Sequence, residues 1–160
     1  MAILASPFTK YANTFVSGDC AGDVIVQEYY VDVTAAQIVL NDIVDLGVLP
    51  ANHTVTDMIL IPDDLDTNGA PTIELDVGIM SGEPGDTVTA RTCGNEFFAA
   101  DQSARTGVIS RMSKPAGFRV QPTGADRSIG VKFQAAAATA AAGRIRLIAF
   151  MAPANPQIAF

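Results

Sequence analysis

Polar and apolar residues alternate at single-residue spacing in several short segments of this chain. The clearest is residues 72–79 (TIELDVGI), in which every second residue is apolar. This period of two indicates a β-strand with one buried and one exposed face. Residues 128–134 (SIGVKFQ) repeat the pattern, and residues 24–33 are rich in β-branched and aromatic side chains, which favour strands. The patterns predict a chain built mainly from short strands.

Two further segments carry helical features. Residues 95–106 (NEFFAADQSART) are the best helix candidate, with Asn95 as N-cap and Gly107 as the stop. Residues 37–46 (QIVLNDIVDL) have a spacing of apolar residues that also fits a helix, but an Asn-Asp pair interrupts them and Gly47 follows at once. We therefore expect a short helix over 95–106, and a strand or a strand with a bend over 37–46.

The remaining segments complete an all-β pattern. Residues 135–142 are mostly alanine, but this tract is shorter than the ~12–15 residues at which even alanine-rich helices become marginally stable alone, so we expect a connection there. The expected strands are residues 24–33, 37–46, 55–61, 72–79, 117–122, 128–134 and 144–151. Short strands separated by turn signals, with one short helix, predict an antiparallel β-sandwich or jelly roll.

The chain of 160 residues is most simply one domain, within which we expect three parts. Residues 1–22 show no sustained period and are expected to form an N-terminal arm or lead-in. Residues 23–151 form the sandwich, and residues 152–160, which contain two prolines, form an extended tail. No apolar run approaches the ~20 residues of a membrane-spanning helix, and no signal peptide is recognisable. We expect a protein made in the cytoplasm that contacts no membrane.

Residues that could carry catalysis are sparse. His53 is the only histidine, and Cys20 and Cys93 are the only cysteines, so neither a catalytic triad nor a zinc ligand set nor a disulfide framework is indicated. Glycine-rich phosphate-binding motifs are absent as well. We expect no enzyme activity, no cofactor and no small-molecule substrate, and we expect both thiols to be reduced.

One segment has part of the pattern of a calcium-binding loop. Residues 63–69 (DDLDTNG) place Asp64, Asp66 and Asn68 at alternate positions before a glycine, as in an EF-hand. However, Glu74 falls one position short of the closing glutamate, and strands rather than helices flank the loop. We therefore favour a turn whose Asp and Asn side chains cap backbone N–H groups, and we keep Asp64, Asp66 and Asn68 as the alternative metal ligands.

Charge is distributed unevenly along the chain. The net charge of −7 argues against binding to nucleic acid phosphates. Residues 1–90 hold 14 acidic residues and one Lys, whereas residues 91–160 hold nine basic and three acidic residues. In one account, acidic and basic residues pair across neighbouring strands, and the residues concerned are Asp23, Glu28, Asp32, Arg144 and Arg146. In the other account, the two signs lie on separate surfaces that meet between subunits or in a larger assembly. Both accounts can hold together.

Several of these segments, taken in order, resemble a known family. The run 45–51 (DLGVLPA), the strand 55–61, the turn 63–66 (DDLD) and the strand 75–79 (LDVGI) look like the capsid cement or decoration proteins of short-tailed bacteriophages. Asn52 follows the LPA turn where that family commonly has glycine or another turn residue. The later segments IGVKF and GRIRL, joined by an Ala/Thr-rich connection, also match, so the resemblance covers roughly residues 24–151.

The resemblance implies a jelly-roll protein that forms homotrimers, sits on the outer face of a phage head and bridges neighbouring major capsid proteins. It implies no catalytic residues. We expect the basic residues of the C-terminal strands to pair with acidic strands, either within the protomer or across an interface between subunits of the trimer; these candidate interface residues are Arg119, Lys132, Arg144 and Arg146. The alternative is a tail or baseplate β-sandwich that binds host-surface carbohydrate. The absence of Trp argues against this alternative, because such sites usually stack sugars on aromatic side chains.

Overall fold

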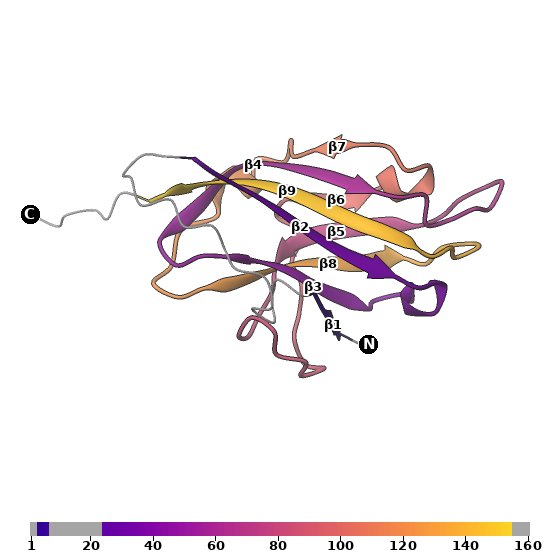
Figure 1. Ribbon diagram of the computed structural model, residues 1–160, viewed down its shortest axis with the longest axis horizontal. Coiled ribbons are helices and arrows are strands. Elements are labelled where there is room, and N and C mark those ends of the chain that lie inside the picture. The colour runs from indigo at the N-terminus through magenta and orange to yellow at the C-terminus, as the bar shows by residue number, and fades with distance from the viewer. Residues whose placement is uncertain (1–2, 7–23, 155–160) are drawn as a thin grey trace, which may run out of the picture.

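Two β-sheets packed against each other make up the fold (Figure 1). The computed structural model describes residues 3–6 and 24–154. The five-stranded sheet contains, in spatial order, β1 (Ile3–Ala5), β3 (Ile43–Leu49), β8 (Arg127–Ala135), β5 (Glu74–Ile79) and β6 (Phe98–Asp101). The four-stranded sheet contains β2 (Ile25–Val33), β9 (Gly143–Pro153), β4 (His53–Pro62) and β7 (Ser110–Arg111). Neighbouring strands are antiparallel, except that β1 is parallel to β3. The predicted all-β sandwich is confirmed.

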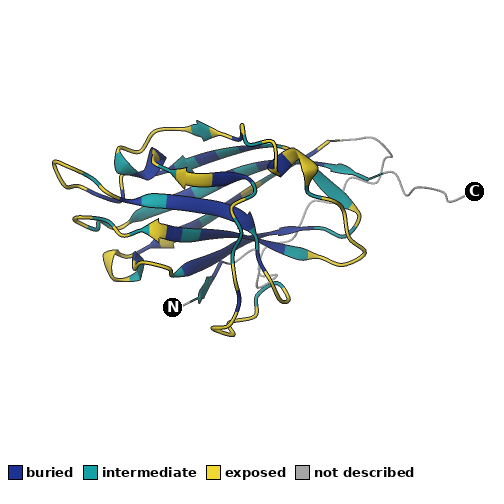
Figure 2. Cartoon of the chain, turned by 180° about the vertical axis from the view of Figure 1, so that it is seen from behind, coloured by how far each residue is buried: buried dark blue, intermediate teal, exposed yellow. Residues whose placement is uncertain are grey.

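The inner faces of the two sheets enclose one hydrophobic core. Along β9, Ile145, Leu147, Ala149 and Met151 are buried, whereas the residues between them are partly exposed. Burying a side chain of this size contributes about 1.5–3 kcal/mol, so the alternation decides which face of the strand points inward. Figure 2 shows the same division across the molecule, with buried residues along the strands and exposed residues gathered in the loops.

Five predicted strands are confirmed with small shifts at their ends. Residues 24–33, 55–61, 72–79, 128–134 and 144–151 correspond to β2, β4, β5, β8 and β9. Residues 37–46 are a strand only in part: a 3-10 turn, η1 (Ala35–Gln37), and a turn at residues 40–41 precede β3, which begins at Ile43. The alanine-rich tract after β8 is a connection, as expected. Periodicity therefore located most of the sandwich.

The helix expected over residues 95–106 is wrong. The segment contains β6 and a 3-10 turn, η2 (Ser103–Arg105), instead. Phe97 and Phe98 are both buried in the core, and the Phe97 N–H donates to the carbonyl of Val77 on β5. Pairing with β5 therefore overrides the local helix signals.

Two related expectations are also wrong. Within the described residues, helical structure is limited to η1, η2 and a third 3-10 turn, η3 (Gly117–Arg119), so the one short helix is absent there. The strand expected over residues 117–122 is replaced by η3. None of the described helices is long and apolar enough to cross a membrane.

The two ends of the chain are described only in part. Ile3–Ala5, within the segment expected as a lead-in, form β1 beside β3, and β9 continues to Pro153, into the expected tail. Residues 7–23 of the expected arm and residues 155–160 of the expected tail lie outside the described residues.

Ala100 on β6 has a left-handed backbone, with φ of 49°. Its N–H donates to Asp76 Oδ1 at 2.8 Å, where the pairing of β5 and β6 is irregular. A residue with a Cβ pays about 1–2 kcal/mol of steric strain in the left-handed conformation, which glycine avoids. Ala100→Gly should therefore raise the free energy of unfolding by about 0.5–1 kcal/mol, measured by urea denaturation. The matched control, Ala99→Gly on the same strand, should lower it. Destabilisation by both substitutions would contradict the prediction.

Candidate interaction surfaces

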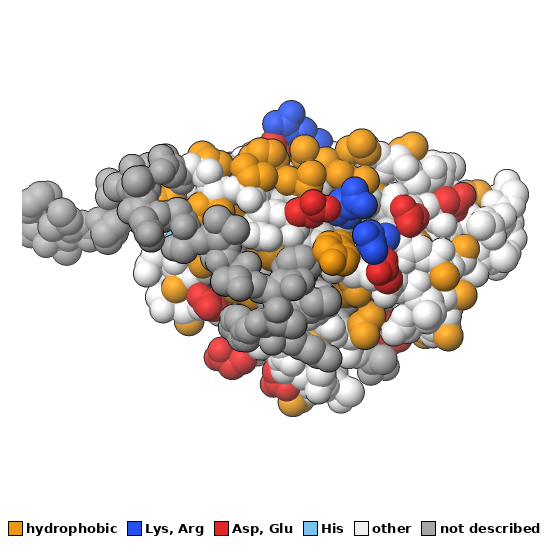
Figure 3. Space-filling model, viewed as in Figure 1, with side chains coloured by type: hydrophobic (Ala, Val, Ile, Leu, Met, Phe, Trp, Pro, Cys, Tyr) orange, Lys and Arg blue, Asp and Glu red, His pale blue; other side chains and the backbone are white. Residues whose placement is uncertain are grey.

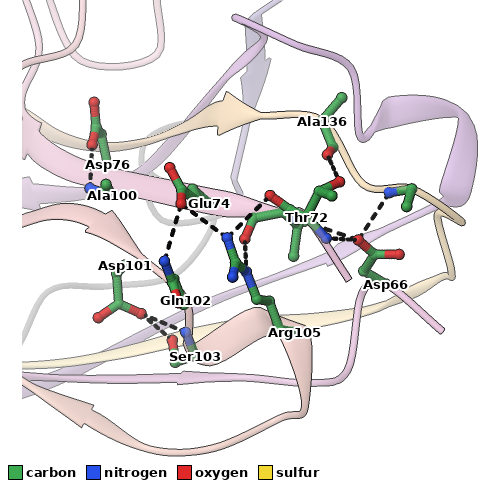
Figure 4. Close-up of polar contacts among 12 residues, drawn as sticks. Asp66, Thr72, Glu74, Asp76, Ala100, Asp101, Gln102, Ser103, Arg105 and Ala136 are labelled. Atoms are coloured by element: carbon green, nitrogen blue, oxygen red, sulfur yellow. Dashed lines mark hydrogen bonds and ion pairs between the residues drawn. The ribbon is translucent and has the colours of Figure 1, made fainter. Parts of the chain in front are cut away.

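Asp66 is the centre of the loop that has part of the calcium-binding pattern. The side chain is buried, with 1% of its surface exposed. Its carboxylate accepts hydrogen bonds from five backbone N–H groups, those of Asn68, Thr72, Ile73, Ala138 and Thr139, at 2.7 to 3.4 Å. Figure 4 shows Asp66 facing Thr72, whose hydroxyl bonds in turn to the carbonyl of Ala136. One carboxylate thus ties the loop after β4 to the connection between β8 and β9.

These bonds also decide the charge state of Asp66. Burial acts to raise the pKa of the carboxyl group, but the backbone N–H groups outweigh it and lower the pKa to about 2. Both oxygens are engaged by the protein itself, so the ionised group serves as an anchor for two loops.

Asp64 and Asn68 act as turn caps in the same loop. Asp64 Oδ1 accepts the Asp66 N–H at 3.1 Å, and Asn68 Oδ1 accepts the Ala70 N–H at 2.9 Å. The capped turn favoured from the sequence accounts for these contacts. No group of three or more His, Cys, Asp or Glu side chains that could hold a metal ion occurs in residues 3–6 and 24–154.

A second polar network joins η2 to β5 beside this loop (Figure 4). Arg105 Nη2 lies 2.9 Å from Glu74 Oε1, and Arg105 Nε donates to the carbonyl of Ile73 at 2.9 Å. Asp101 accepts hydrogen bonds from the N–H and hydroxyl of Ser103. These contacts fix the position of the chain after β6.

A buried ion pair, which the sequence reasoning missed, anchors the loop between β5 and β6. Arg91 Nη1 lies 2.6 Å from Asp45 Oδ2 on β3, and both side chains are almost fully buried. Ser128 on β8 bridges them, accepting from Arg91 at 2.8 Å and donating to Asp45 at 3.1 Å. Arg91 also donates to the backbone carbonyls of Ser81 and Asp86, each at 2.6 Å. The two charges are 46 residues apart in the chain, so no local pattern marks them.

Among the described residues, the Cys93 thiol and the His53 ring are the remaining groups that could take part in a reaction. Burial is the main cause that raises the pKa of the Cys93 thiol, to about 12, so the thiolate is disfavoured. Cys93 is a free thiol, and Cys20 lies outside the described residues. His53 Nδ1 lies 2.8 Å from the carbonyl oxygen of Ala51 at the start of β4.

Two of the expected interface arginines pair within the protomer. Arg144 on β9 donates to both oxygens of Asp32 on β2, at 2.7 and 2.9 Å, and its guanidinium lies 4.6 Å from the centre of the Tyr30 ring. Arg146 Nε lies 3.0 Å from Glu28 Oε1, without an aligned hydrogen bond. The hydrogen bond from Arg144 lowers the pKa of Asp32. Cross-strand pairing therefore holds for these four residues, whereas Asp23 lies outside the described residues.

The other two expected interface residues lie elsewhere. Lys132 is on β8, as expected, and its ammonium donates to Gln134 Oε1 at 3.0 Å. Arg119 is on η3 rather than on a C-terminal strand, because the expected strand is absent. Arg119 is exposed. Lys132 lies on the five-stranded sheet, whereas Arg144 and Arg146 lie on the four-stranded sheet, so the four residues do not form one cluster.

The outward face of the four-stranded sheet combines charged and apolar side chains. Figure 3 shows acidic and basic side chains together near the middle of this face, with hydrophobic side chains along the upper rim. Ile59 on β4 lies opposite Ile148 on β9, and both are partly exposed. At the rim, Asp57 accepts a hydrogen bond from Arg111 Nε at 2.7 Å. Exposed apolar side chains bordered by polar ones are typical of protein interaction surfaces.

Comparison with solved structures finds phage capsid chains that are similar to this one. A chain of the capsid of Ralstonia phage GP4 is 43% identical, with a TM-score of 0.92, and the match covers 96% of this chain and 99% of that chain. A chain of the capsid asymmetric unit of cyanophage Pam1 is 25% identical, with a TM-score of 0.65, over 89% of this chain and 96% of that chain. No family model and no curated protein matches the sequence.

Proposed function

This chain belongs to the phage capsid protein family that includes a chain of the Ralstonia phage GP4 capsid. We propose that it is a cement protein of the outer face of a phage head. The observation that carries the virion role is the 43% identity over 99% of the GP4 capsid chain. The cement role rests on the resemblance of residues 45–51, 63–66 and 75–79 to the cement protein family. The match to the cyanophage Pam1 capsid supports the same virion role. A structural component of a virion needs binding surfaces rather than a reaction centre.

Charge supports a position outside the shell. The chain has a net charge of −7, and a surface of this sign is repelled by the phosphates of packaged DNA. The exposed acids Asp63, Asp64, Glu83 and Asp86 lie in loops. An acidic protein is therefore better suited to the outer surface than to the inner one.

The rigid loops support a role in holding neighbouring proteins together. The Asp66 carboxylate and the Asp45–Arg91 pair fix loops at different places on the sandwich. Loops that are already ordered lose less conformational entropy when they bind. Many small contacts of this kind, repeated by the symmetry of a shell, add up to strong attachment. The partner we propose is the major capsid protein, bridged by homotrimers of this chain.

The test uses phage heads assembled without this protein. Purified chain should co-sediment with such heads and raise the temperature at which they release DNA. Heads that already carry the protein serve as the control and should bind little more. Failure to bind, combined with binding to host-surface glycans on an array, would contradict the cement function and favour a tail or baseplate module.

The oligomeric state is tested separately by light scattering. A homotrimer of the 16.7 kDa chain should give about 50 kDa, three times that mass. A monomer at every concentration would contradict the homotrimer.

A further inference from the structure

Among residues 3–6 and 24–154, one arginine makes no side-chain hydrogen bond or ion pair. Of the nine Lys and Arg residues in the described part of the chain, eight make a side-chain hydrogen bond or ion pair. The ninth is Arg119, an exposed residue on η3. Arg144 and Arg146, which seemed equally good interface candidates, already pair with Asp32 and Glu28. Their charges are largely neutralised inside the protomer, so Arg119 is the arginine most available to a partner.

The surroundings of Arg119 suit an anchor at an interface. Phe118 beside it is 52% exposed. The start of the turn packs tightly on the core. Gly117 is buried, and a Cβ added to it would lie within 3.1 Å of Met112 and Phe97. Aromatic residues and arginine held in a fixed position are the side chains most enriched in the energetic centres of interfaces. We define Phe118 and Arg119 as the aromatic–basic turn.

A surface of complementary chemistry lies in the loop between β5 and β6. This loop projects from the sandwich at the bottom of Figure 1. At its tip, Glu83 and Asp86 are exposed and take part in no ion pair with the described residues, and Val88 is 54% exposed. We define residues 83–88 as the acidic tip. It offers two negative charges and one apolar side chain, which match an arginine and a phenylalanine.

The acidic tip is held in a fixed shape by the buried ion pair. Arg91 donates to the carbonyl of Asp86 at 2.6 Å, and the Gly85 N–H donates to Asp45 Oδ2 at 2.9 Å. The Val88 N–H is in turn bound by Asp86 Oδ1 at 3.0 Å. A preorganised loop of this kind binds at a low entropic cost.

We propose that the aromatic–basic turn of one copy binds the acidic tip of a second copy. The turn packs beside β4 of the four-stranded sheet, whereas the tip is anchored through Asp45 on β3 of the other sheet. Two different patches therefore meet, and a contact of this heterologous kind closes into a ring when the rotation between copies allows it. The contact rests on the homotrimer of the proposed function and identifies the residues that form it.

The test exchanges the charges of the two patches. Arg119→Glu and Glu83→Arg, each alone, should weaken self-association at least tenfold, measured as mass by light scattering over a concentration series at low salt. The two substitutions combined should restore most of the association. Phe118→Ala should weaken association in a manner nearly independent of salt, since its contribution is apolar.

A matched control separates this contact from a general effect of charge. Arg105 is a partly exposed arginine, but it pairs with Glu74 in the same protomer. Arg119→Gln should weaken association, whereas Arg105→Gln should leave it unchanged. Normal association of Arg119→Glu, a combined variant that stays dissociated, or a wild-type chain that is always monomeric would each overturn the contact.

Binding to heads distinguishes this contact from the proposed function. If Arg119→Glu associates normally and the wild-type chain still binds heads, the contact is wrong and the cement function stands. If the charge exchange behaves as expected in solution but no variant binds heads, the contact stands and the cement function is wrong. If Arg119→Glu self-associates normally and loses only head binding, the turn contacts another capsid protein, which overturns the contact between copies.

Discussion

Asp66→Ala should lower the free energy of unfolding by about 4 kcal/mol. The substitution removes the carboxylate that accepts five backbone N–H groups from two loops. Each buried donor left without an acceptor costs about 1–3 kcal/mol, reduced where water can reach it. Urea denaturation measures the change, because the midpoint shifts at nearly constant slope.

Asp64→Ala is the matched control for this prediction. Asp64 lies two residues away in the same loop, is exposed, and accepts one backbone N–H. Its removal should cost about 1 kcal/mol or less. Equal losses for the two variants would show that the five bonds to Asp66 contribute no more than one ordinary cap.

The same carboxylate should make stability depend on pH in the acid range. The pKa of Asp66 is about 2 in the folded protein, below its ordinary value of 3.8. A lowered folded pKa gives stability that is fully present above pH 3.8 and is lost as the pH falls towards 2. The difference in unfolding free energy between wild type and Asp66→Asn should therefore shrink between pH 4 and pH 2. A constant difference over that range would contradict the pKa.

The capped turn around Asp66 illustrates how far local sequence reasoning reaches. Alternating Asp and Asn side chains before a glycine predict caps, and Asp64 and Asn68 act in that way. The bonds from Ala138 and Thr139 could not be predicted, because they come from residues more than 70 positions away. Their presence depends on the register of β8 and β9, which no short motif specifies.

The cross-strand ion pairs were only partly predictable from the sequence. The opposite charges of early and late strands suggested that they pair, and β2 and β9 bring Asp32 opposite Arg144 in the register. The sequence could not decide which of the basic residues would be satisfied in this way. Only the fold separates the paired Arg144 and Arg146 from Arg119, and that separation changes which residue is expected at an interface.

The incorrect helix over residues 95–106 has a different cause. Its local signals, an Asn cap and a glycine stop, were sound, but they compete with the burial of Phe97 and Phe98 between the sheets. Burial of two phenylalanines outweighs the few tenths of a kcal/mol per residue that helix propensity offers. Segments of this length are decided by tertiary contacts, and here they place Ala100 in a strand with a left-handed backbone.

Arg91→Met should lower the free energy of unfolding by about 3–5 kcal/mol. The substitution removes the cation beside a buried carboxylate, that of Asp45, which lies 2.6 Å from Arg91. Replacing both charges, in Asp45→Asn with Arg91→Met, should cost less than Arg91→Met alone, because no buried charge then lacks its counter-ion. Urea denaturation of the single and double variants measures this coupling.

Arg105→Met is the control for the role of burial. Arg105 pairs with Glu74 at 2.9 Å, but each side chain is 25% exposed, so its loss should cost about 1 kcal/mol or less.

Arg91→Met should in addition speed amide hydrogen exchange in residues 81–90, because Arg91 holds the carbonyls of Ser81 and Asp86. Since the acidic tip belongs to that loop, Arg91→Met should weaken self-association even where the chain stays folded. Unchanged exchange in the loop would show that the buried ion pair stabilises the sandwich without shaping the tip.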